Sequence, residues 1–109
     1  MSRRLAEQRC EPCHGDVPPL AGEELEELLD ELPSGWRAVD EHHLEKTFEF
    51  EDFVAALDFV NEVGELAEEQ GHHPDIHLTW GEATIQIWTH AIDGLSENDF
   101  ILAAKIERL

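Results

Sequence analysis

The spacing of apolar residues along this chain alternates between that of a helix and that of a strand. Between Leu25 and Leu32, leucines recur at i, i+3, i+4 and i+7, which is typical of one face of a helix. By contrast, Ile76, Leu78 and Trp80 occupy every second position, as in a strand with one buried face. This alternation restricts the chain to folds that mix helices with short strands.

The predicted elements follow in the order helix, two strands, helix, two strands, helix. We expect them over residues 22–32, 36–40, 44–50, 52–70, 75–80, 83–90 and from 96 onward. A short turn joins the strands of each pair, so each pair forms an antiparallel hairpin. The sequence therefore predicts a two-layer α+β fold, in which a four-stranded antiparallel sheet carries helices on one face in the order α-β-β-α-β-β-α.

The first 21 residues differ in composition from the rest, being charged and then rich in proline and glycine. We expect residues 1–21 to form an N-terminal extension lying on the surface, and residues 22–109 to form one domain. Hydrophobic residues make up 41% of the chain, more than a disordered chain contains.

The charge is strongly one-sided, with 26 acidic and seven basic residues and a formal net charge of −19. Such a surface repels phosphates, which disfavours direct binding to nucleic acid or to anionic membranes. No run approaches the roughly 20 consecutive apolar residues of a membrane span, and the N-terminus lacks the apolar region of a signal peptide. We therefore expect a cytoplasmic protein.

Helix stop signals place a group of histidines at one end of the second hairpin. Gly71 is a natural end for the second helix, and His72 and His73 follow it directly, before the next strand. His90 is expected at the end of the returning strand, so the hairpin brings the three imidazoles close together. His77 falls on the polar face of the strand and is expected to be structural or exposed. Imidazole titrates near neutral pH, so the group is suited to proton transfer.

The sequence leaves room for other roles of histidine and cysteine. His42 and His43 are expected in a solvent-exposed loop. A zinc site could use imidazoles from the group that comprises His72, His73, His77 and His90, although adjacent histidines rarely both reach one ion. The segment Cys10-Glu11-Pro12-Cys13-His14 matches the string of haem attachment and half of many zinc sites, but it has neither an export signal nor a second paired motif.

Several motifs together resemble the signature of the pterin-4a-carbinolamine dehydratases. They are Glu68-x-x-x-His72-His73-Pro74, an aromatic residue at Trp80, Thr89-His90, Gly94-Leu95-Ser96-x-x-Asp99, Gly35-Trp36 and Phe48-x-Phe50-x-Asp52-Phe53. The resemblance covers roughly residues 25–109, and the segment from Cys10 to Leu20 is similar to the N-terminal extension of bacterial members.

The resemblance implies a hydro-lyase. The reaction would be loss of water from 4a-hydroxytetrahydropterin to give the quinonoid dihydropterin, as part of tetrahydropterin recycling, with neither metal nor organic cofactor. The hydroxyl leaves as water and needs a proton donor, while a ring nitrogen loses a proton and needs a base. Histidine can fill either role near pH 7.

The same resemblance assigns the catalytic residues. His72, His73 and His90 would line the pterin pocket, with His73 and His90 closest to the leaving hydroxyl and the ring proton. His72 would orient the substrate or share the acid role. Glu68, one helical turn earlier, would support His72 as its carboxylate partner, or else be a solvated carboxylate of an acidic helix.

Three further residues are implied as substrate-binding. Thr89 could form a hydrogen bond with the pterin. Trp36 could wall the pocket by stacking, or belong only to the core. Asp99 lies in the signature, yet its place in an S-x-x-D capping box explains it without a role in the site.

An alternative function is a binding module on the same fold. Relatives of this family also act as dimerisation partners or transcriptional coactivators, and divergent ones resemble assembly chaperones that have lost the histidines. Retention of His72, His73 and His90 favours catalysis here. The resemblance also implies a homodimer or homotetramer, for which an exposed edge strand of a small sheet is a ready surface.

Overall fold

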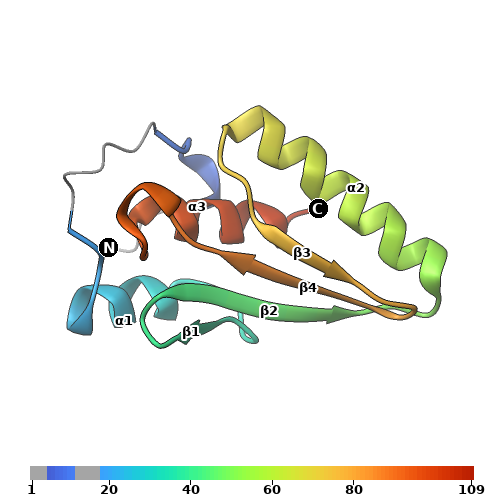
Figure 1. The fold of residues 1–109 in the computed structure, drawn as a ribbon, viewed down its shortest axis with the longest axis horizontal. Coiled ribbons are helices and arrows are strands. Elements are labelled where there is room, and N and C mark those ends of the chain that lie inside the picture. The colour runs from blue at the N-terminus through green and yellow to red at the C-terminus, as the bar shows by residue number, and fades with distance from the viewer. Residues whose placement is uncertain (1–4, 12–17) are drawn as a thin grey trace.

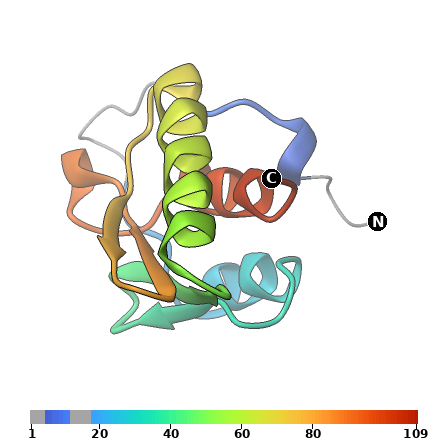
Figure 2. The same cartoon turned by 90° about the vertical axis from the view of Figure 1, so that its right-hand side faces the viewer.

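A computed structural model describes residues 5–11 and 18–109 as an α+β fold (Figure 1). The strands form one antiparallel sheet in the order β1-β2-β4-β3, and the helices cover one of its faces (Figure 2). The elements are η1 (Leu5–Glu7), α1 (Gly22–Asp30), β1 (Arg37–Val39), β2 (His43–Glu49), α2 (Phe53–Gln70), β3 (Asp75–Leu78), β4 (Glu82–Ile87), η2 (His90–Ile92) and α3 (Glu97–Ile106). The predicted fold class and element order are confirmed.

Helix caps fix the boundaries that position the histidines. The Asp52 carboxylate accepts a hydrogen bond from the Ala55 amide at 2.9 Å and starts α2. Gly71 ends α2 in the left-handed conformation, with φ of 67°, and its N–H binds the carbonyl of Ala67. Ser96 caps α3 in a capping box that Asp99 completes. The chain therefore changes direction immediately before His72.

Both strands of the second hairpin are shorter in the structure than predicted. β3 ends at Leu78, because the Thr79 amide already bonds across the turn to the carbonyl of Glu82. β4 ends at Ile87, before His90, because Thr89 forms a bridge with Gly94 that folds the chain back. The prediction that His90 ends a strand is thus wrong, and His90 begins the short helix η2 instead.

His43 was predicted to lie in a solvent-exposed loop, and this prediction is wrong because His43 begins β2. Asp40 and Glu41 both take left-handed φ values, 54° and 55°, and the His42 amide bonds to the carbonyl of Val39 at 2.8 Å. This tight turn brings His43 into register opposite Val39, as the first residue of β2. Its side chain is only 17% exposed.

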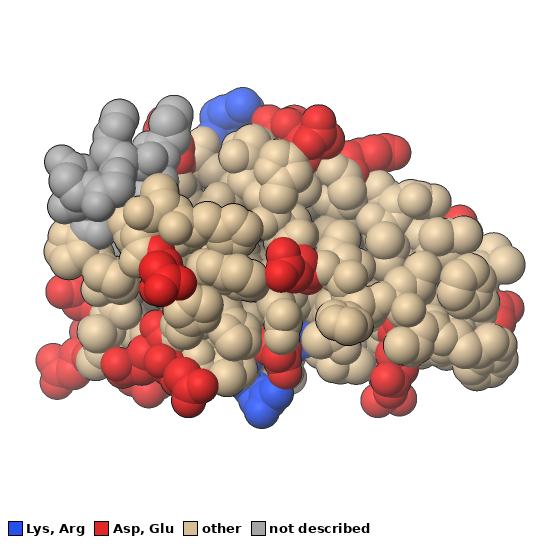
Figure 3. Space-filling model, viewed as in Figure 1, with Lys and Arg blue, Asp and Glu red and all other residues tan. Residues whose placement is uncertain are grey.

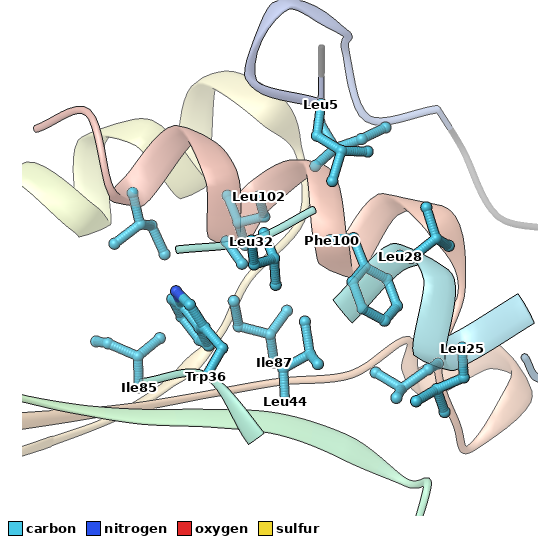
Figure 4. Close-up of a cluster of buried hydrophobic side chains, with 14 of the residues drawn as sticks. Leu5, Leu25, Leu28, Leu32, Trp36, Leu44, Ile85, Ile87, Phe100 and Leu102 are labelled. Atoms are coloured by element: carbon cyan, nitrogen blue, oxygen red, sulfur yellow. The ribbon is translucent and has the colours of Figure 1, made fainter. Parts of the chain in front are cut away.

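The core lies between the sheet and the helices (Figure 4). Alternate residues of β4, Ala83, Ile85 and Ile87, are fully buried, and Ile85 and Ile87 cluster with apolar side chains of α1 and α3. Leu5 of η1 joins this cluster with only 4% of its surface exposed. The expectation that the N-terminal extension lies on the surface is therefore wrong at Leu5, whose apolar side chain is buried. Residues 1–4 and 12–17 lie outside the described residues, and the division at residue 22 stays a prediction.

Acidic side chains are spread over the face in Figure 3, with few basic ones among them. Across residues 5–11 and 18–109, no helix is both long enough and apolar enough to cross a membrane.

Candidate active site

A cavity of about 370 Å³ opens where the C-terminal end of α2, the segment after β4 and the start of α3 meet. It contains all the imidazoles to which the sequence analysis gave a catalytic role. The lining residues are Glu11, Gly71, His72, His73, Trp88, Thr89, His90, Ala91 and Asn98.

His72 is held by a buried carboxylate. Its Nε2 lies 2.6 Å from Oδ1 of Asp99, which is completely buried. The other oxygen of Asp99, Oδ2, accepts hydrogen bonds from the Thr89 hydroxyl at 2.9 Å and from the Ser96 amide at 2.8 Å. This network fixes the position and orientation of the His72 ring.

Glu68 pairs with His73, at 2.5 Å between Oε2 and Nε2, and its predicted pairing with His72 is wrong. The prediction relied on the four-residue spacing of Glu68 and His72, which corresponds to one turn of a regular helix. Gly71 breaks that register, because its left-handed conformation turns the chain. His72 then meets α3, and His73 lies back against Glu68. The side chains of Glu68 and His73 remain 78% and 58% exposed.

Trp88, like Glu11 and Asn98, lines the cavity although the sequence analysis gave it no role there. Its ring lies 4.6 Å from the ring of His90 and 5.3 Å from that of His42, centroid to centroid. His42 lies in the turn before β2, as predicted, and its Nε2 bonds to the Asp93 carboxylate at 2.8 Å. The alternation of the predicted strand put Trp88 on one face with His90, and this was the available signal.

Trp36 lies in the core and not in the cavity. It is 6% exposed, packs edge-on against Phe48 and donates from Nε1 to the Glu107 carboxylate at 3.1 Å. Of the two roles that the sequence left open for Trp36, the structure of one chain supports the core role and not the pocket wall, because its ring is buried and lies outside the cavity lining. The hydrogen bond to Glu107 satisfies the indole N–H, which would otherwise be buried without a partner.

Of the remaining residues considered in the sequence analysis, Thr89 lines the cavity and His77 does not. Thr89 lines the cavity, but its hydroxyl already donates to Asp99 and lies 2.6 Å from the hydroxyl of Ser96. His77 is exposed on β3, opposite Thr84, and outside the cavity lining. In the described part of the chain, no group of three or more His, Cys, Asp or Glu side chains is placed to hold a metal ion. Cys13 and His14 of the C-x-x-C-H string are outside that part.

Taken together, the fold and the cavity define a small α+β protein in which three imidazoles, two of them bonded to carboxylates, line one opening. Residues 18–109 match the family described as "Pterin 4 alpha carbinolamine dehydratase". The chain belongs to this family.

Individual relatives agree with this assignment. The chain is 64% identical over 105 residues to a protein of Rubrobacter xylanophilus, covering 96% of this chain and 97% of that one. It is 50% identical over 103 residues to a protein of Rickettsia canadensis, covering 94% of each. Both are named "Putative pterin-4-alpha-carbinolamine dehydratase".

A solved structure of a "transcriptional coactivator/pterin dehydratase" from Brucella melitensis has the same fold. Its TM-score is 0.77 at 30% sequence identity, over 83% of this chain and 96% of that one.

Proposed function

We propose that this protein catalyses the dehydration of 4a-hydroxytetrahydropterin to quinonoid dihydropterin and water by histidine acid/base catalysis, in tetrahydropterin recycling in the cytoplasm. The observation that carries the proposal is the convergence of His72, His73 and His90 on one cavity. Family membership supports the substrate class.

The different surroundings of the imidazoles suggest different roles. His73 and His90 are exposed, so they can exchange protons with solvent between turnovers. One would protonate the leaving 4a-hydroxyl, and the other would take the proton from the ring nitrogen as the C4a–O bond breaks. His72 is half-buried and fixed to Asp99, which suits it to orient the substrate. Trp88 offers an aromatic face for the flat pterin ring.

An activity assay tests this proposal. A synthetic 4a-carbinolamine dehydrates slowly unaided, and we expect the purified protein to accelerate its decay in proportion to enzyme concentration. The product is followed by its ultraviolet absorbance, with heat-unfolded protein as the control. Decay at the spontaneous rate in the presence of folded protein would refute the catalytic function.

We further propose that the protein forms a homodimer or homotetramer, which could also serve a dimerisation or coactivator-type binding role. β1 and β3 are the edges of the sheet. Two large apolar side chains are exposed: Val54 in the first turn of α2 at 63%, and Trp80 between β3 and β4 at 68%. Analytical ultracentrifugation should then give two or four times the 12.4 kDa mass of one chain. A single species of 12.4 kDa at micromolar concentration would contradict this.

A further inference from the structure

The described N-terminal residues 5–11, which we call the strap, run along α3 toward the C-terminal end of α2 (Figure 2). At the start of the strap, Leu5 is buried in the core, and the carbonyl of Ala6 accepts a hydrogen bond from Lys105 Nζ at 2.9 Å. These contacts anchor the strap to the far end of α3 from the histidines.

The other end of the strap is attached to both helices that frame the cavity. The Cys10 amide donates to Oε1 of Gln70, the last residue of α2, at 3.0 Å. The Asn98 side chain bonds both sides of Glu11: its Oδ1 accepts from the Glu11 amide at 2.9 Å, and its Nδ2 donates to the Glu11 carbonyl at 2.5 Å. Glu11 and Asn98 both line the histidine cavity. The strap is thus one wall of the site.

The carboxylates around the cavity are not equally available to a ligand. Asp99 is bonded to His72, Thr89 and Ser96, and Glu68 is bonded to His73. The Glu11 carboxylate is exposed and forms no hydrogen bond or ion pair with the described residues, while the backbone of Glu11 is held at both its N–H and its C=O. A fixed backbone reduces the entropy lost when a side chain orders on a ligand.

On the basis of the proposed function, we infer that Glu11 binds the amino-pyrimidinone edge of the pterin and is a substrate-positioning residue. This edge carries the 2-amino group and the N3–H side by side, two donors that match the two acceptor oxygens of one carboxylate. The histidines, which come from other walls of the cavity, would then face the reacting end of the ring. Glu11 would therefore favour the binding of pterins over that of related ring systems that lack the 2-amino group.

The inference is tested by a pair of ligands and a pair of variants. Binding of 7,8-dihydropterin and of its 2-deamino counterpart is measured by calorimetry. We expect the wild-type protein to prefer the 2-amino form by about 10- to 100-fold, as for hydrogen bonds to a charged group. Glu11→Gln should reduce this preference to less than about threefold. Glu7→Gln removes the same charge from an exposed strap residue outside the cavity lining, and should leave the preference intact.

The Cys10 thiol reports whether the strap stays docked. Its Sγ lies 3.6 Å from the Asn98 carbonyl, and burial raises the pKa of Cys10 to about 11, partly offset by the positive charge of Lys105. In a Cys13→Ser background, labelling at pH 8 should therefore be slow, and it should stay slow in Glu11→Gln. Asn98→Ala, which removes both hydrogen bonds to Glu11, should speed labelling and weaken the preference.

The outcomes separate this inference from the proposed function. Suppose that the wild-type protein dehydrates the carbinolamine but Glu11→Gln keeps the full preference for the 2-amino ligand. The role of Glu11 is then overturned and the catalytic function stands. The same conclusion follows if Glu11→Gln weakens the binding of both ligands equally while Cys10 stays protected from labelling. If the wild-type protein neither binds dihydropterin nor accelerates dehydration, both fail.

Discussion

Replacing both His73 and His90 with alanine is expected to lower the rate of carbinolamine dehydration to that of the spontaneous reaction. Each positioned acid or base typically contributes about 10²- to 10⁴-fold. Both side chains are exposed at the cavity and contribute little to the core, so the double variant should fold normally. The measurement is kcat from stopped-flow decay of the synthetic carbinolamine, with circular dichroism to verify the fold.

His77→Ala is the matched control, because His77 is an exposed histidine close in sequence but outside the cavity lining. It should keep the wild-type kcat. The single variants His73→Ala and His90→Ala should each lose much of the rate, and their losses need not add, because groups that act in one step are coupled. A double variant that retains a tenth or more of the wild-type kcat would show that these imidazoles do not carry the proton transfers.

The sequence predicted best those features that depend on local signals. Asp52, Gly71 and Ser96 act within a few residues of themselves, and each ends or begins a helix where expected. The antiparallel hairpins followed from alternation and short turns. The turn after the second helix also brought His72 and His73 to the cavity that His90 lines.

Long-range partners could not be read from spacing. The bond between His72 and Asp99 joins residues 27 positions apart and depends on how α3 packs beside the end of α2. The tryptophans show the same limit. Trp36 precedes a short strand and is buried in the core, whereas Trp88 follows a short strand and lines the cavity. The surroundings of each ring depend on residues far away in sequence: Trp36 packs on Phe48 and bonds to Glu107, whereas Trp88 lies between His42 and His90.

Replacing Asp99 with alanine is expected to have the largest effect on stability. Asp99 is completely buried and bonds to His72, Thr89 and the Ser96 amide. Removing one partner of a buried charged pair typically costs about 3–5 kcal/mol, and the loss includes one half of the capping box. Urea unfolding followed by circular dichroism would measure the decrease in the free energy of unfolding. A loss below about 1 kcal/mol would contradict the central role of this carboxylate in the network.

Asp99→Asn separates the cap from the catalytic site. Asparagine keeps the size of the side chain and one acceptor oxygen, so it should fold, but it removes the negative charge that faces His72. If Asp99 positions His72 for the reaction, kcat should fall about 10-fold or more while the variant remains folded. Asp52→Ala is the control, because it removes only an exposed N-cap and should cost about 0.5–2 kcal/mol without changing kcat. Full activity in a folded Asp99→Asn variant would leave Asp99 as a helix cap alone, and the orientation of His72 would then have to come from the substrate itself.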